Sequence, residues 1–125
     1  MVNPAQAYVG QMVTTASPAR LLVMLYERLQ LDLRRGIHAQ ESGDHSAAGT
    51  HLLHAQDIVL ELSASLRTDV WGGAPALAAI YDWLHRELVR ANVDRDVAAT
   101  RDCLAIVEPL AEAWQEAALA AAAVG

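Results

Sequence analysis

Apolar residues recur at every third or fourth position through four separate stretches of this 125-residue chain. In the first stretch these residues are Leu22, Leu25, Leu29, Leu33 and Ile37. Such spacing places the apolar side chains on one face of an α-helix, whereas a half-buried strand would need alternating apolar and polar residues. The pattern predicts helices that cover about residues 18–41, 46–67, 75–92 and 96–119.

The first predicted turn contains residues that end one helix and begin the next. Gly43 suits a backbone with positive φ, which most other residues avoid. The side chain of Asp44 or of Ser46 can accept a hydrogen bond from a free backbone N–H of the following helix. We therefore expect a short reversal of the chain at this point.

The last predicted turn has similar chemistry. Asn92 is expected to end its helix, because asparagine tolerates left-handed geometry. Asp94 or Asp96 can then cap the final helix. Long helices joined by such short loops pack as antiparallel neighbours. We predict an all-α fold, an antiparallel up-down four-helix bundle that forms a single domain over residues 1–125.

Local features modify this picture at several places. Residues 1–16 are polar and small for the most part, and they are predicted to form a mobile N-terminal arm. Gly36 indicates a close approach of two helices, and Pro109 predicts a kink where it interrupts helical hydrogen bonding. Leu21 and Met24 lie off the main apolar stripe, which indicates that the first helix is buried against several neighbours.

Acidic residues outnumber basic ones, with 15 Asp and Glu against 9 Lys and Arg and a formal net charge of −6. This balance argues against nucleic acid or an anionic membrane as the main partner, because both need a basic face. Residues 21–26 form the longest strongly apolar run, far below the roughly 20 residues of a membrane-spanning helix, so no membrane insertion is expected. The lone Cys103 and the absence of a leader pattern indicate the cytosol.

Sequence motifs of catalysis are absent: the chain has no P-loop, no Gly-x-Gly-x-x-Gly and no Gly-x-Ser-x-Gly. Cys103 lies within a predicted helix and is expected to be inert, and the acidic residues are expected mostly at helix caps and on solvated outer faces. We predict no enzyme, no cofactor and no metal. Two alternatives stay open, a metal-binding bundle centred on His51, His54 and His85 and a bundle that self-associates through Trp114 and its Ala-rich tail.

Several apolar residues are not needed for the predicted core. They are Leu53 and Leu60 on the second helix, Trp83 on the third, and Tyr8 and Met12 in the arm. Contacts within the chain can absorb such residues, since single exposed apolar side chains are common. The alternative is a groove for an amphipathic helix of another protein, with anchors spaced three and four residues apart.

A set of short strings resembles the family of the flagellar secretion chaperone FliS. In chain order they are Tyr8 ahead of Val13, Thr15-Ala16-Ser17-Pro18, Met24-Leu25-Tyr26, Ala55-Gln56-Asp57-Ile58 with Glu61-Leu62, Gly72-Gly73, Ile80-Tyr81-Asp82, Leu88, Ala91-Asn92, Asp96 and Trp114. The family's Tyr-Asp-Tyr is here Tyr81-Asp82-Trp83, which keeps an aromatic residue in third place. Each string alone is weak, but the whole set in order covers the chain from Tyr8 to Trp114.

This resemblance implies an antiparallel helical bundle that binds the disordered C-terminal segment of flagellin. A chaperone of this family prevents premature polymerisation of flagellin in the cytoplasm and keeps it competent for type III secretion through the flagellar export apparatus. The client segment would lie around the bundle as separate helical pieces. A weak homodimer stays open as a further association.

The resemblance and the surplus of apolar residues together predict the partner-binding residues, which are Tyr8, Met12, Leu53, Gln56, Leu60, Tyr81 and Trp83. Leucine and tryptophan side chains would act as anchors. Gln56 would bond the client backbone or cap a client helix, unless it is merely a solvent-facing helix residue. Tyr8 and Met12 would fold over the groove when no client is bound, and Tyr81 would either contact the client or pack in the core.

Overall fold

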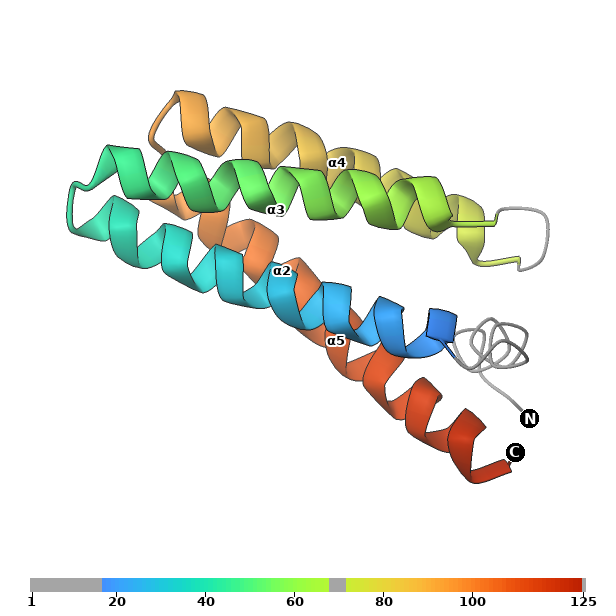
Figure 1. The fold of residues 1–125 in the computed structure, drawn as a ribbon. Coiled ribbons are helices and arrows are strands. Elements are labelled where there is room, and N and C mark those ends of the chain that lie inside the picture. Colours follow the sequence, from blue (N-terminus) through green and yellow to red (C-terminus); the bar gives the residue numbers. More distant parts are fainter. Residues whose placement is uncertain (1–16, 68–71, 125) are drawn as a thin grey trace.

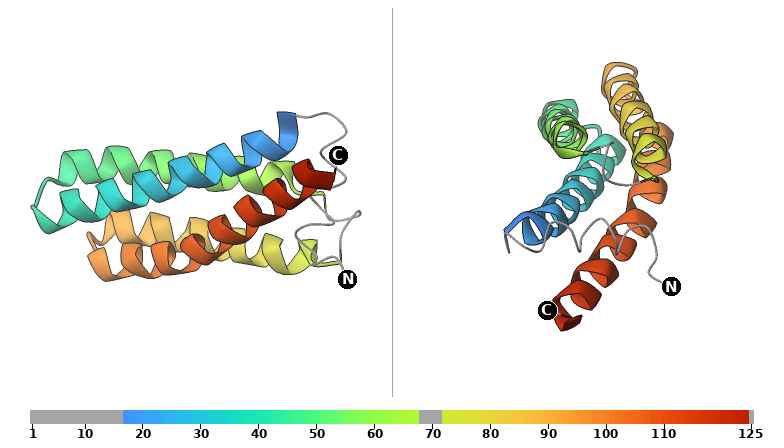
Figure 2. Two further views of the ribbon diagram at one scale, coloured as in Figure 1. Left: turned by 90° about the horizontal axis from the view of Figure 1, so that it is seen from below. Right: turned by 90° about the vertical axis from the view of Figure 1, so that its right-hand side faces the viewer.

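The computed structural model describes residues 17–67 and 72–124, which form a bundle of long helices (Figure 1). The helices are α2 (Ser17–Glu41), α3 (His45–Ser65), α4 (Ala74–Val93) and α5 (Val97–Val124), and these two ranges contain no strand. α2 packs mainly against α3 and α5, while α4 packs against α3 and α5, so the helices surround one core (Figure 2). The predicted all-α four-helix bundle is confirmed. The predicted arm, 1–16, lies outside the described residues.

The turn between α2 and α3 has the predicted chemistry. Gly43 has a φ of 75°, in the left-handed region that glycine adopts without a steric penalty. Oδ1 of Asp44 accepts a hydrogen bond from the backbone N–H of Ala47 at 3.0 Å. Of the two candidate caps, Asp44 is therefore the one that begins α3.

The turn between α4 and α5 differs from the prediction at one residue. Asn92 lies inside α4, because helical hydrogen bonding continues to the N–H of Asp94. The left-handed conformation falls instead on Arg95, with a φ of 54°. The prediction for Asn92 was wrong, but one of the two predicted caps is present, since Oδ1 of Asp96 accepts from the N–H of Ala99 at 3.2 Å.

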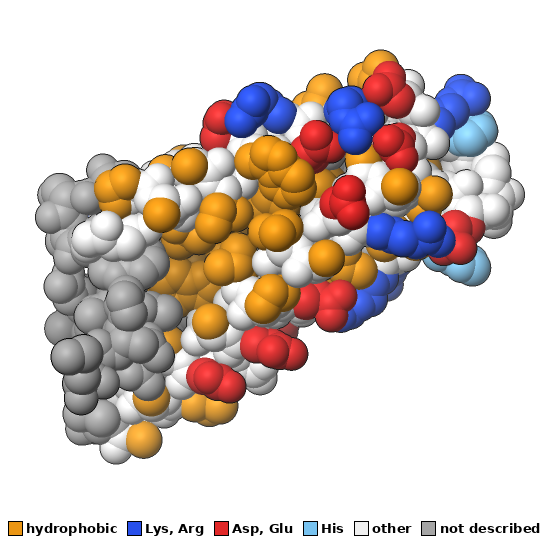
Figure 3. All heavy atoms as spheres, turned by 180° about the vertical axis from the view of Figure 1, so that it is seen from behind, with side chains coloured by type: hydrophobic (Ala, Val, Ile, Leu, Met, Phe, Trp, Pro, Cys, Tyr) orange, Lys and Arg blue, Asp and Glu red, His pale blue; other side chains and the backbone are white. Residues whose placement is uncertain are grey.

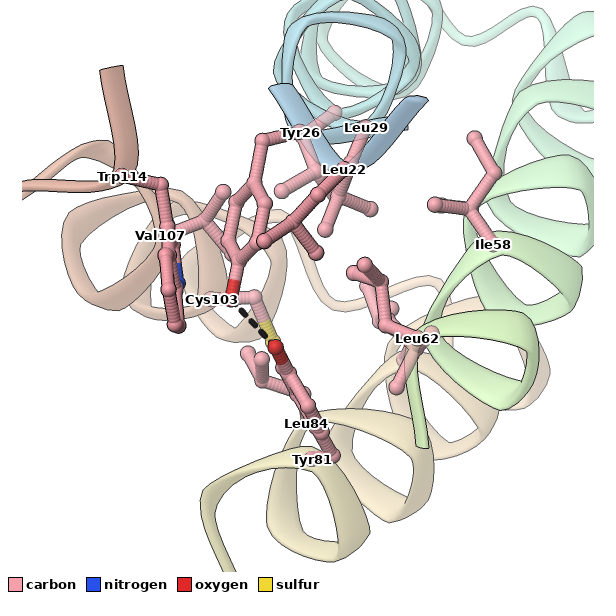
Figure 4. Close-up of a cluster of buried hydrophobic side chains, with 14 of the residues drawn as sticks. Leu22, Tyr26, Leu29, Ile58, Leu62, Tyr81, Leu84, Cys103, Val107 and Trp114 are labelled. Carbon is pink, nitrogen blue, oxygen red and sulfur yellow. Dashed lines mark hydrogen bonds between the residues drawn. The ribbon is translucent and has the colours of Figure 1, made fainter. Parts of the chain in front are cut away.

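The core is one cluster of apolar side chains contributed by all four described helices (Figure 4). Its largest fully buried aliphatic members are Leu29, Leu33, Leu52, Leu62, Leu84, Leu88, Val59 and Val107. Burial of each such side chain contributes roughly 1.5–3 kcal/mol. Among them lie two tyrosines, Tyr26 of α2 and Tyr81 of α4, whose hydroxyl oxygens are 2.6 Å apart in a hydrogen bond. This bond joins two helices across the middle of the bundle.

α2 and α3 approach each other closely at Gly36, as predicted. A Cβ atom at this position would lie 3.1 Å from Cδ2 of Leu52 and 3.9 Å from Cβ of His51. A side chain at this position would therefore require Leu52 to shift, and a large one would not fit between the two helices as they are packed.

α5 extends to Val124, beyond its predicted end at residue 119. Pro109 lies inside this helix and has no N–H to donate, so the predicted kink would be centred there. The alanines that follow have the highest helix propensity of all residues, which explains the added length. None of the described helices is both long enough and apolar enough to cross a membrane.

Candidate functional site

Two leucines of α3 project into solvent. Leu53 is 54% exposed and Leu60 is 51% exposed. They are seven residues apart, which is two helical turns, so they lie on the same face of α3. Their exposure agrees with the prediction that the core does not need them.

The face that carries these leucines borders α4. Position 49, one turn before Leu53, is next to α4, because a Cβ on Gly49 would lie 3.7 Å from Oδ1 of Asn92. Val89, one turn before Asn92 on the antiparallel helix α4, is also exposed. Leu53 and Leu60 thus lie on the flank of α3 nearest to α4, and we call this pair of exposed leucines the α3–α4 strip; Leu53 also lines a cavity with Arg28 and Asp32 of α2.

Two of the predicted contact residues lie deeper than the strip. Gln56 belongs to the same stripe of α3 as the two leucines but is only 8% exposed. The alternative that Gln56 is solvent-facing was wrong, because its side chain lies in the seam beside α4. Tyr81 is buried in the core with its hydroxyl bonded to that of Tyr26, a position that fits the packing role.

Trp83 lies on the opposite flank of α4, the one that faces α5. Glu87 lies one turn further along this flank. Burial, and after it the charge of Glu87, raises the pKa of Cys103 of α5 to about 12. Glu87 is therefore close to α5. Trp83 is half-buried and packs against the core, as does Leu110 of α5. Hydrophobic side chains gather between α4 and α5 when the molecule is viewed from behind (Figure 3). The structure therefore does not bring Trp83 together with the α3–α4 strip. Trp83 belongs to a second apolar surface, which lies between α4 and α5.

A third apolar region lies on α2, where Leu21 is 55% exposed and Met24 is 50% exposed. The expectation that this part of α2 is buried on several sides was wrong. α2 packs mainly against α3 and α5, so the side of the helix that faces away from both stays in solvent. Sequence periodicity showed that these residues were off the main stripe, but it could not show that none of the described helices α3–α5 covers them.

One acidic residue departs from the expectation of solvated outer faces. Asp32 of α2 is fully buried, and its Oδ2 accepts a hydrogen bond from Nδ1 of His54 on α3. Nε of Arg28 lies 3.3 Å from the other carboxylate oxygen. Burying a carboxylate is costly unless cations and hydrogen-bond donors surround it. His54 bonds Oδ2 and Arg28 places a cation near Oδ1, but Oδ1 itself has no hydrogen-bond partner among the described residues. The cluster links α2 to α3 beside Leu53.

The histidines considered for metal binding do not form a site in the described ranges, where no group of three or more His, Cys, Asp or Glu residues is placed to hold an ion. His54 is engaged by Asp32, and His85 lies on α4, away from α2. Cys103 is fully buried in α5, and its raised pKa favours the protonated thiol over the nucleophilic thiolate.

Fold and surface together define the structural class, a four-helix bundle that presents apolar side chains at helical spacing to solvent. The profile of the family described as "Flagellar protein FliS" matches residues 1–121. The chain belongs to this family of flagellar secretion chaperones.

Individual relatives agree with this assignment. The chain is 32% identical over 115 residues to the flagellar secretion chaperone FliS of Bacillus subtilis (strain 168), covering 92% of this chain and 86% of the relative. It is 33% identical over 114 residues to FliS of Salmonella typhimurium (strain LT2), covering 90% of this chain and 84% of the relative. The resemblance seen in the sequence motifs is confirmed.

Proposed function

We propose that this chain is a cytosolic export chaperone for flagellin and not an enzyme. It binds the disordered C-terminal segment of flagellin, prevents premature polymerisation and keeps the client competent for type III secretion through the flagellar export apparatus. Membership of the chaperone family supports this proposal, as do the apolar side chains that the bundle leaves in solvent. Apolar contacts can form and dissociate without a chemical step, so such a chaperone needs no cofactor.

The observation that carries the proposal is the α3–α4 strip. A client helix with apolar residues every three or four positions can place them against Leu53 and Leu60. Complete burial of a leucine contributes roughly 1.5–3 kcal/mol, and each of these is about half exposed, so each would add about 1 kcal/mol on binding. The pair then contributes about 2 kcal/mol, or roughly 30-fold in Kd.

The other predicted contact residues take different roles in this proposal. Trp83 provides an anchor on the α4–α5 surface, so that a client would lie over more than one side of the bundle as separate helical pieces. Gln56 offers its amide to the client backbone from within the seam, and Tyr81 holds α4 in place from below. Tyr8 and Met12 belong to the arm that competes with the client.

The test of the strip is a double variant, Leu53→Asp with Leu60→Asp. The assay measures binding of a fluorescent peptide, made to the C-terminal segment of the flagellin from the same organism, by anisotropy. A matched control replaces Leu31 of α2 and Leu119 of α5 by Asp, because both residues are exposed and neither helix carries the strip. We expect at least a 30-fold weaker Kd for the strip variant, a less than three-fold change for the control, and unchanged far-UV circular dichroism for both. Equal affinity of the two variants would remove the strip from the binding site.

The role of the arm has a separate test. Deleting residues 1–14 should leave client affinity unchanged or raise it, because a competitor for the same surface has been removed. A weaker Kd of the shortened chain would show instead that the arm holds the client directly.

A further inference from the structure

A second kind of surface lies near the turn between α2 and α3. A cavity of about 510 Å³ opens there, and its charged and polar lining consists of Arg34, Arg35, His38, Ser42, Asp44 and His51. Two arginines and two histidines thus face one cavity, in a chain whose formal net charge is −6. We call these four side chains the basic pocket.

The positive charge of this pocket is poorly neutralised within the part of the chain that the structure describes. Arg35 has no ion-pair partner in residues 17–67 and 72–124. Arg34 approaches Glu108 of α5 only to 4.0 Å, with both side chains about half exposed, so water screens this pair strongly. Asp44 is the acidic residue in the lining, and its Oδ1 is engaged by the backbone N–H of Ala47.

The helix packing holds the pocket in shape. Gly36 follows Arg35 in α2 and has no side chain, so α3 can come close to α2 at this point. A Cβ atom placed on Gly36 would lie 3.9 Å from Cβ of His51, which is an ordinary van der Waals distance. His51 is consequently half-buried beside the arginines instead of extending freely into water. The lining thus comes from two helices whose spacing the core determines, with both arginines on α2 and His51 on α3.

We propose that the basic pocket docks an acidic segment of a partner protein. All nine basic residues of the chain are arginines, whose planar guanidinium donates two parallel hydrogen bonds to a carboxylate. The complementary ligand is therefore a peptide segment with two or more Asp or Glu side chains. Nucleic acid fits less well, because the chain as a whole carries a formal net charge of −6. The arginines of the pocket come from α2, whereas both leucines of the strip come from α3, so each site can be altered separately by mutation.

The probe for this pocket is a fluorescein-labelled twelve-residue helical peptide with Glu at every third or fourth position, and a second peptide with Gln in place of each Glu serves as the neutral comparison. Binding is measured with the full chain in the absence of any flagellin peptide. We expect the Glu peptide to bind and the Gln peptide to bind at least ten-fold more weakly, with the Glu peptide losing affinity as salt is raised. Arg35→Glu should weaken the Glu peptide at least five-fold, whereas Arg86→Glu, the same charge change on an exposed residue of α4, should not.

Several outcomes would overturn this assignment: equal binding of the two peptides, equal effects of the two arginine variants, or complete displacement of the Glu peptide by millimolar inorganic phosphate, which would show a site for a free anion only. The double variant Leu53→Asp with Leu60→Asp should bind the Glu peptide as the parent does. The basic pocket can thus be refuted while the flagellin proposal stands, and the reverse is equally true.

Discussion

The hydrogen bond between Tyr26 and Tyr81 offers a direct test of how the bundle is held together. The two hydroxyl oxygens are 2.6 Å apart, and both side chains are almost completely buried (Figure 4). Replacing either tyrosine by phenylalanine keeps the ring and removes only the hydroxyl. A net hydrogen bond is worth about 1 kcal/mol, and depriving a buried hydroxyl of its bond costs about 1–3 kcal/mol. We expect a loss of about 1–2 kcal/mol in the free energy of unfolding for each single variant.

Each single variant leaves the hydroxyl of the other tyrosine without this bond. In the double variant no polar atom of the pair is left buried, and its loss should fall short of the sum of the singles by about 1 kcal/mol.

Urea unfolding followed by far-UV circular dichroism measures the free energy of unfolding for the parent, both singles and the double. The four values form a thermodynamic cycle, and the quantity of interest is the coupling energy between the two hydroxyls. Additivity of the two changes within about 0.3 kcal/mol would refute the reasoning, because it would mean that the hydroxyls act independently.

Other predictions concern protonation, packing and helix capping. Burial raises the pKa of Tyr26 to about 12, so the folded chain favours the neutral phenol. The resulting stabilisation is complete below pH 10 and is lost between about pH 10 and 12, by up to roughly 3 kcal/mol. In urea unfolding, the free energy of unfolding of the Tyr26→Phe variant should therefore decline less steeply over this pH range than that of the parent. Cys103 should resist iodoacetamide in the folded chain and react once urea unfolds it, as mass spectrometry would show; fast labelling of the folded chain would contradict its burial. Asp44→Ala should lower the free energy of unfolding by about 1 kcal/mol through loss of the cap, with Asp44→Asn as the control that retains it. Gly36→Leu should lower the same quantity by about 1–3 kcal/mol by forcing α2 away from Leu52, and a thermal midpoint equal to that of the parent would rule out the close approach.

The helices could be predicted from local sequence because each residue involved acts on its nearest neighbours along the chain. Helical spacing of leucines, the positive φ of Gly43 and the cap at Asp44 depend on backbone geometry within a turn or two. The prediction for Asn92 failed because local sequence did not show how far the hydrogen bonding of α4 continues. That extent decides whether Asn92 or Arg95 adopts the left-handed conformation.

The candidate surfaces could be predicted only in part. Leu53 and Leu60 are off the apolar stripe of their helix, and their exposure followed from that alone. Leu21 and Met24 are apolar in the same way, yet the sequence placed them in the interior, because periodicity shows which faces are apolar and not which faces have a neighbour. Family motifs supplied the resemblance to the FliS family, which the match to residues 1–121 then confirmed.

Sequence by itself determined the helical class of this protein, the positions of its turns and the existence of apolar residues beyond the core, since these follow from spacing and local backbone preference. Tertiary structure alone decided which residues from different helices meet. It buried Asp32 against His54, separated Trp83 from the α3–α4 strip, and gathered the basic pocket across α2 and α3. The physical reason is that such contacts depend on which helices are neighbours and on how closely they approach, and neither is encoded in the period of a single helix.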